Sequence, residues 1–129
     1  HSKYFDFPGN DGHEIERQPK LQYRFTPSYR LPIDWATLRA FTTYSFVGER
    51  WANAGNTVKL PSYSTIDAGL VASFDDGIEV RLTGTNLTNT IGLTEGNFRA
   101  PNAAPGPDGA ILARPLFGRA FELSVGFAF

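Results

Sequence analysis

Arg119 to Phe129, which reads RAFELSVGFAF, is the stretch that decides the fold of this chain. Large apolar side chains occupy every second position from Phe121 to Phe129, and small or polar side chains occupy the positions between them. Because successive side chains of a β-strand point to opposite faces, this period of two predicts a strand with one bulky apolar face. A strand that crosses a membrane needs this pattern, since one face meets lipid and the other meets a polar interior.

The composition of the chain is compatible with a membrane barrel and argues against several other classes. Its 129 residues include 11 Phe, 5 Tyr and 2 Trp, an ample supply for the aromatic bands at membrane interfaces. The longest apolar runs are far too short for a membrane helix, whereas the strands of a barrel leave only a weak hydropathy signal. Cys is absent, which excludes disulfides and thiol chemistry, and a net charge of -1 gives no reason to expect nucleic-acid binding.

Alternation with a period of two also recurs upstream, while helical periodicity is nearly absent. In addition to the terminal strand, it predicts strands over residues 20–31, 35–47, 63–74 and 78–87. Pro27 is expected to interrupt the first of these, because proline cannot donate a backbone hydrogen bond to a neighbouring strand. Trp35 and Phe41 depart from the alternation of the second strand.

The connections between these strands alternate between short and long. Residues 31–34 and Asp75-Asp76-Gly77 are predicted to be short turns, whereas residues 48–62 and 88–115 are long. Outer-membrane barrels have short periplasmic turns and long extracellular loops, so we expect an all-β, antiparallel transmembrane β-barrel. The predicted strands are too few to close a barrel, and an open edge in lipid leaves backbone groups unsatisfied. We therefore expect further strands upstream in the same polypeptide.

The polar faces of the predicted strands carry charges of both signs. The residues expected to face the barrel interior are Arg24, Arg30, Arg39, Asp67, Glu79, Arg81 and Glu122. A ladder of solvated charges in a wet interior is the simpler interpretation. The alternative is that some of these residues form specific pairs, and Arg81 with Glu122 is one pair that facing strands could form.

Four short motifs, in a fixed order, resemble those of the TonB-dependent receptors. They are LPSYSTID at Leu60 to Asp67, NLTN at Asn86 to Asn89, LTEGNFR at Leu93 to Arg99 and ARPLFGR at Ala113 to Arg119. Each motif is weak alone, but all of them in order before a terminal Phe make a strong pattern. The one departure is Phe98, which stands where proline is common.

This resemblance implies a fold and a function for the whole receptor. TonB-dependent receptors are barrels of about 22 strands whose interior is plugged by an N-terminal globular domain. Residues 1–129 would then be the last five strands of the barrel domain, with the plug domain absent from this chain. The implied function is active outer-membrane uptake of a nutrient ligand such as a saccharide or a ferric siderophore, without catalysis. Phe127 and Phe129 would belong to the signal that directs barrel assembly. Some of the interior-facing charges would hold the plug in place, for example Glu79 through a lysine or arginine of the plug.

The resemblance also implies a location and a set of partners. The location is the outer membrane of a Gram-negative bacterium. The partners are membrane lipid and lipopolysaccharide, the plug domain, the TonB-ExbB-ExbD complex acting through the plug, the barrel assembly machinery and a small-molecule ligand. No cofactor, metal or nucleic acid is expected.

Two sets of loop residues are candidates for ligand contact. Trp51, Asn53 and Asn56 offer an aromatic plane with amides nearby, which suits a sugar ring, and Glu95, Asn97 and Arg99 offer a second set. The simpler interpretation of both sets is packing within the loops. The acids of the first loop and His13 have no recognisable metal-ligand spacing, so a metal site is not expected there.

Other functions remain open alternatives at this point. A passive porin shares the strand pattern but has no plug domain. A soluble all-β carbohydrate-binding module would bury the apolar faces of these strands in a core and would need no detergent. An enzyme is disfavoured, because no nucleophile elbow, triad or phosphate-binding glycine loop is present.

Overall fold

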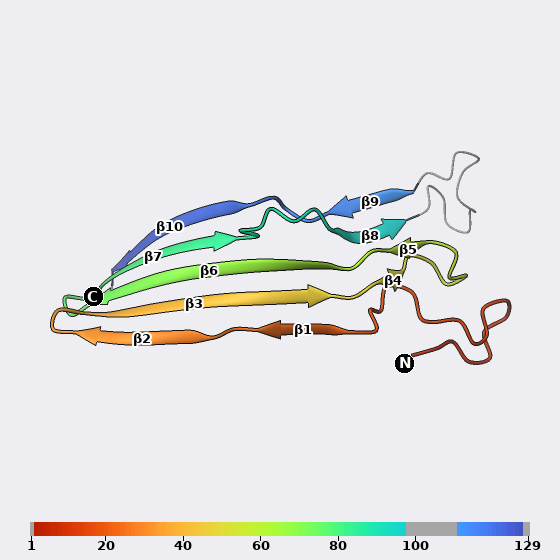
Figure 1. Ribbon diagram of the computed structural model, residues 1–129, viewed down its shortest axis with the longest axis horizontal. Helices are drawn as coiled ribbons and strands as arrows, with labels where there is room; N and C mark the ends of the chain where they lie inside the picture. Colours follow the sequence, from red (N-terminus) through yellow and green to blue (C-terminus); the bar gives the residue numbers. More distant parts are fainter. Residues whose placement is uncertain (1, 98–110, 128–129) are drawn as a thin grey trace. The chain divides into compact units, whose positions relative to one another are not determined.

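A computed structural model of the chain describes residues 2–97 and 111–127, and the regular structure in these residues consists of β-strands (Figure 1). The main sheet has the strand order β1-β3-β6-β7-β10, and β2 also pairs with β3. Its strands are β1 (Gln22–Phe25), β2 (Ser28–Ile33), β3 (Ala36–Val47), β6 (Tyr63–Phe74), β7 (Ile78–Thr85) and β10 (Ala120–Phe127). No helix in the described residues is long and apolar enough to cross a membrane.

Two small antiparallel hairpins lie outside the main sheet. One pairs β4 (Arg50–Trp51) with β5 (Lys59–Leu60), and the other pairs β8 (Leu93–Asn97) with β9 (Leu112–Pro115). By its internal contacts the chain divides into two compact units. The first holds both hairpins and the N-terminal segment, in residues 1–22, 46–63 and 91–116, and the second holds most of the main sheet.

The structure confirms most of the predicted strands and corrects the long connections. β6 has the predicted bounds, and the strand breaks between β1 and β2 at Thr26-Pro27, as the proline requires. The turn predicted at residues 31–34 is wrong, because residues 31–33 pair with β3 as part of β2 and the turn lies at residues 34–35. The segments 48–62 and 88–115 were expected to be loops, but they contain the two hairpins. These hairpins are too short and too polar to produce a period of two.

The register of the main sheet sorts its side chains onto two faces. Leu82 of β7 lies opposite Leu70 of β6 and Leu123 of β10, so these leucines share one face. Arg81 lies opposite Val71 and Ser124 on the other face. The first is the apolar face and the second is the polar face, as the alternation predicts.

The apolar face is uncovered in the part of the chain that the structure describes. Phe121 is 69% exposed and Leu123 is 67% exposed, and Leu70 and Leu82 are each 48% exposed. The buried apolar side chains of the described residues are only Ala36, Ala52, Leu60 and Val71. A water-soluble domain would bury these large side chains in a core, so the exposed face calls for an apolar environment.

Two glycines of the sheet are covered by aromatic rings from neighbouring strands. On the polar face, a Cβ added to Gly69 would lie 2.3 Å from the ring of Phe41. On the apolar face, a Cβ added to Gly84 would lie 3.0 Å from the ring of Phe121, its partner in the register. Phe41 therefore breaks the alternation because its ring fills the space over a bare glycine backbone.

Candidate functional site

The charged residues predicted for the barrel interior lie on the polar face of the sheet. Glu79 and Arg81 come from β7, Arg39 from β3 and Glu122 from β10, and their register partners are other polar-face residues. Two more are held by single hydrogen bonds: Arg24 Nε donates to Ser45 Oγ at 3.2 Å, and Asp67 Oδ1 accepts from the backbone N–H of Asn86 at 2.8 Å.

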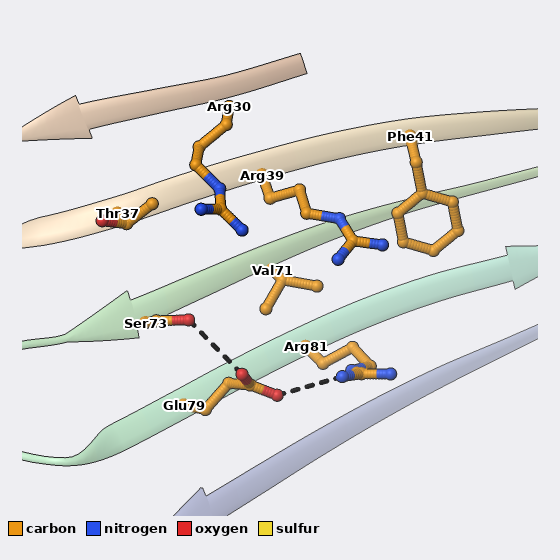
Figure 2. Close-up of a pocket in the computed structure, with 8 residues that line it drawn as sticks. All are labelled: Arg30, Thr37, Arg39, Phe41, Val71, Ser73, Glu79 and Arg81. Atoms are coloured by element: carbon orange, nitrogen blue, oxygen red, sulfur yellow. Dashed lines mark hydrogen bonds and ion pairs between the residues drawn. The ribbon is translucent and has the colours of Figure 1, made fainter. Parts of the chain in front are cut away.

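Four neighbouring strands of this face surround a pocket of about 200 Å³, shown in Figure 2. We call it the arginine pocket, because its lining includes three arginines. The lining residues are Arg30 from β2, Thr37, Arg39 and Phe41 from β3, Val71 and Ser73 from β6, and Glu79 and Arg81 from β7. All of them follow or precede the short turns at residues 34–35 and 75–77, which place them at one end of the sheet.

The charges in the arginine pocket are unbalanced. Glu79 is the only carboxylate among the described residues that line it, and that group accepts hydrogen bonds from Arg81 Nη2 at 3.1 Å and from Ser73 Oγ at 3.3 Å. Arg30 and Arg39 lie directly opposite each other in the register of β2 and β3. Neither forms an ion pair within residues 2–97 and 111–127, although Arg39 lies 5.7 Å from the centre of the Phe41 ring.

The ion pair of Arg81 differs from the one that the sequence suggested. Arg81 pairs with Glu79 on its own strand, two residues away and on the same face. Glu122 lies opposite Thr83 instead, because the register of β7 and β10 places Ser124 across from Arg81. The alternation identifies which face a charge occupies but leaves the offset between two strands undetermined.

The NLTN motif ends β7 with two asparagines in the left-handed region of backbone space. Asn86 has a φ of 46°, is buried, and donates from Nδ2 to the carbonyls of Thr90 and Phe117 at 3.0 and 2.9 Å. Asn89 has a φ of 51° and accepts from the backbone N–H of Arg119 at 3.1 Å. Asparagine tolerates this conformation better than most residues, so the motif fixes the turn that leads out of the strand.

The first set of ligand candidates forms many bonds within its own unit. Asn56 binds the backbone of Glu14 twice, accepting from its N–H at 2.8 Å and donating to its carbonyl at 2.9 Å. Trp51 Nε1 donates to Glu14 Oε2 at 2.8 Å, and Lys59 Nζ lies 4.9 Å from the centre of the Trp51 ring. Asn53 Oδ1 accepts from two backbone N–H groups of its own turn. We call Glu14, Lys20, Trp51 and Asn56 the loop cluster.

The second set is also engaged where the structure describes it. Glu95 Oε2 lies 3.7 Å from Arg114 Nη1 across the β8–β9 hairpin, and Asn97 Oδ1 accepts from Arg17 Nη2. Arg99 lies outside the described residues. Phe127 is on the apolar face of β10, and Phe129 is also outside the described residues.

The family of the chain can be stated at this point, with the sheet and its polar face described. Residues 2–87 match the TonB-dependent receptor-like β-barrel family, which is more than half of the chain. The chain belongs to this family. Comparison with curated protein sequences gave no significant match.

Two solved receptor structures are similar to the chain. BauA, the ferric preacinetobactin receptor of Acinetobacter baumannii, is 25% identical with a TM-score of 0.72 over 91% of this chain. FyuA, the ferric yersiniabactin uptake receptor of Yersinia pestis, is 16% identical with a TM-score of 0.72 over 90% of this chain, and shows the fold alone. The chain spans only 16% and 17% of the lengths of these two proteins.

One residue that sequence reasoning missed is important in this receptor segment. Arg50 is 5% exposed, and its Nη2 donates to the carbonyls of Leu93 and Thr94, the latter at 2.8 Å. Its guanidinium also lies 5.5 Å from the centre of the Tyr63 ring. Arg50 therefore fastens the start of the LTEGN strand. A lone arginine beside a loop gives no sequence signal for this role.

Contacts within the loop cluster shift the pKa values of two of its charged groups. Hydrogen bonds from Lys20 and Trp51 lower the pKa of the Glu14 carboxyl below its ordinary value, and the bond with Glu14 raises the pKa of Lys20. His13 Nδ1 lies 3.1 Å from the carbonyl of Ala54. Among the described residues, no group of three acidic, His or Cys side chains is arranged to hold a metal ion.

Proposed function

We propose that this chain supplies the C-terminal strands of the barrel of a TonB-dependent receptor, with a plug domain elsewhere in the same polypeptide. The complete receptor would take up a nutrient ligand actively across the outer membrane of a Gram-negative bacterium. The observation that carries the proposal is the sheet with one exposed apolar face and one charged face, in a chain that belongs to this family. Lipid would cover the apolar face, and the charged face would line the interior.

The orientation of the strands follows from the lengths of their connections. The turns at 34–35 and 75–77 are short, so we place them in the periplasm, and the segments that contain the hairpins would be extracellular. The partners in this proposal are lipopolysaccharide and lipid, the plug domain, TonB-ExbB-ExbD, the barrel assembly machinery and a small ligand. Phe127 and Phe129 would serve in assembly.

We place a ferric siderophore first among ligands, since BauA, which is 25% identical to this chain, is the ferric preacinetobactin receptor. A saccharide is the second candidate, because the LTEGN segment resembles receptors linked to such nutrients. Contacts would come from Trp51, Asn53, Asn56, Glu95, Asn97 and Arg99 in the extracellular segments.

Energised uptake by cells that carry the full-length receptor is the decisive test. We expect uptake of labelled ligand to stop when a protonophore collapses the inner-membrane proton gradient, and also when TonB is removed. Uptake that continues without energy would indicate a passive porin. A native protein that stays monomeric in water without detergent would indicate a soluble β-sheet module instead.

A role of Trp51 in ligand binding can be separated from its role within the loop cluster. Trp51→Ala removes both the ring and the N–H bond to Glu14, whereas Trp51→Phe removes only that bond. If the ring contacts ligand, we expect Trp51→Ala to weaken ligand affinity about 10-fold and Trp51→Phe to preserve it. Equal affinities for both variants and the wild-type receptor, measured by titration calorimetry, would remove Trp51 from the ligand site.

A further inference from the structure

Within residues 2–97 and 111–127, the two opposed arginines of the arginine pocket form no ion pair. Arg30 and Arg39 are direct register partners on the same face, and like charges in this position destabilise a pair of strands. Glu79, the one carboxylate among the lining residues that the structure describes, is already bonded to Arg81 and Ser73. Figure 2 shows Glu79 bonded to Ser73 and Arg81, with Val71 between this carboxylate and the side chain of Arg39. The pocket therefore has an excess of positive charge beside Arg30 and Arg39.

The position of Arg39 restricts where a counter-charge can come from. Neighbouring strands lie about 4.8 Å apart, and Arg39 is on β3, with β2 on one side and β6 on the other. A further strand added beyond β2 could bring a carboxylate to Arg30, but Arg30 would stand between that strand and Arg39. The partner of Arg39 must therefore approach from above the polar face, which is the barrel interior in the proposed receptor.

We propose that the arginine pocket is an anion-binding site on the inner wall of the barrel, and that its ligand is an Asp or Glu carboxylate of the plug domain. This inference rests on the proposed function, because it needs a plug inside the barrel. Arginine guanidiniums bind carboxylates with paired hydrogen bonds, and a pocket of about 200 Å³ has room for a carboxylate group. The plug carboxylate bridges Arg30 and Arg39 and so relieves their repulsion.

The site also has a defined place along the strands. The pocket lies next to the short turns at residues 34–35 and 75–77. In the proposed orientation those turns are periplasmic, so the carboxylate holds the part of the plug that faces TonB. The pocket thus contributes to how firmly the plug is retained when TonB acts on it.

Plug release from the full-length receptor tests this site directly. The purified receptor is placed in planar lipid bilayers, and the urea concentration at which pores open is measured for Arg39→Gln, Arg30→Gln and the double variant. We expect Arg39→Gln and the double variant to open at a urea concentration lower by about 1 M, because a charged hydrogen bond is lost. Arg39→Lys, which keeps the charge, should recover most of the difference.

A matched control comes from the same face of the sheet. Arg24 is also a polar-face arginine, but it is bonded to Ser45 and lies outside the pocket, so Arg24→Gln should open at the wild-type urea concentration. The melting temperature of the barrel is recorded for every variant, and it should stay unchanged if only plug retention is affected. Phosphate added to the wild-type receptor should compete with the plug carboxylate and lower the urea concentration at which pores open. It should not change that concentration for Arg39→Gln.

Three results would overturn the inference. In the first, Arg39→Gln behaves like Arg24→Gln. In the second, Arg30→Gln alone reproduces the double variant while Arg39→Gln has no effect, which means that a neighbouring strand supplies the counter-charge. In the third, phosphate stabilises the barrel and leaves plug release unchanged in all variants, which means that the resident ligand is a free anion. If the receptor still shows energised uptake, any of these results overturns the inference about the pocket and leaves the proposed function intact. If energised uptake is absent, the proposed function itself is contradicted.

Discussion

The strands of the main sheet and the segments that contain the hairpins are stabilised by different kinds of bonds. Strands β6, β7 and β10 are joined by backbone hydrogen bonds over long antiparallel registers, and few of their side chains are buried: those of β10 are exposed, and most of those of β6 are half-buried. The first unit relies on individual polar side chains such as Arg50 and Asn56, each of which binds backbone groups of another segment. The sheet should therefore tolerate many substitutions that keep apolar residues on the apolar face and polar residues on the polar face. The loop segments should depend on particular residues.

The largest expected effect is a charge placed on the apolar face of the sheet. Leu82 lies between Leu70 and Leu123 on that face, so Leu82→Arg should lower the free energy of unfolding by about 2–4 kcal/mol in lipid vesicles. Thr83→Arg puts the same charge on the polar face, opposite Glu122, and should change stability little. If urea titrations show the same loss of unfolding free energy for the two variants, the assignment of the faces is wrong.

A smaller effect is expected where an aromatic ring covers a glycine. Gly69→Ala places a methyl group 2.3 Å from the ring of Phe41, so the ring must move, at a cost of about 1–3 kcal/mol. Gly126→Ala is the matched control, because its methyl group would meet no atom within 4 Å. The same unfolding measurement checks both. If Phe41→Leu does not relieve the loss caused by Gly69→Ala, the ring contact is not its cause.

In the loop segments, one side-chain amide should matter because it binds a residue that is far from it in sequence. Asn56→Gly keeps the positive φ of 51° accessible but removes both bonds to the Glu14 backbone. We expect amide exchange at Glu14 to become about 10-fold faster, which corresponds to about 1.4 kcal/mol. Asn56→Asp keeps only the acceptor and should produce a smaller change. Unaltered exchange in both variants would mean that the loop is held by other contacts.

The smallest effect should be a response of the loop cluster to pH. Because the pKa of Glu14 is lowered, its ionised form contributes stability above the ordinary value of 4.5, and this contribution is lost as the pH falls further. Because the pKa of Lys20 is raised, its contribution is present below 10.5 and is lost above that value. In a Trp35→Phe receptor, the fluorescence of Trp51 should change at low pH, and Glu14→Gln should abolish this transition. A transition of equal size in Glu14→Gln would assign it to another group.

The sequence predicts the sheet far better than the loops, for a physical reason. A strand that spans a membrane must alternate over its whole length, so β6 and β10 can be read from their own residues. β4 and β5 have two residues each, and β8 needs Arg50, which comes from another segment of the chain. No local pattern contains that information.

The same limit applies to the candidate site. Alternation placed Arg30, Arg39 and Arg81 on one face, and their register partners agree with that assignment. It did not predict that Arg30 lies opposite Arg39 or that Arg81 pairs with Glu79, because these depend on the offset between strands. The offset is set by turn geometry, which side-chain identity only partly specifies.

The covering of Gly69 by Phe41 and of Gly84 by Phe121 has a consequence for how this sheet can change over evolution. Each pair divides one volume between two strands, so the ring is accepted only where its partner has no side chain. A larger residue at Gly69 is harmful until Phe41 becomes smaller, whereas at Gly84 it also meets Leu87, whose Cδ2 would lie 2.6 Å from the added Cβ. Loss of either ring leaves bare backbone uncovered. In related chains, the two members of each pair should therefore be inherited together and replaced together.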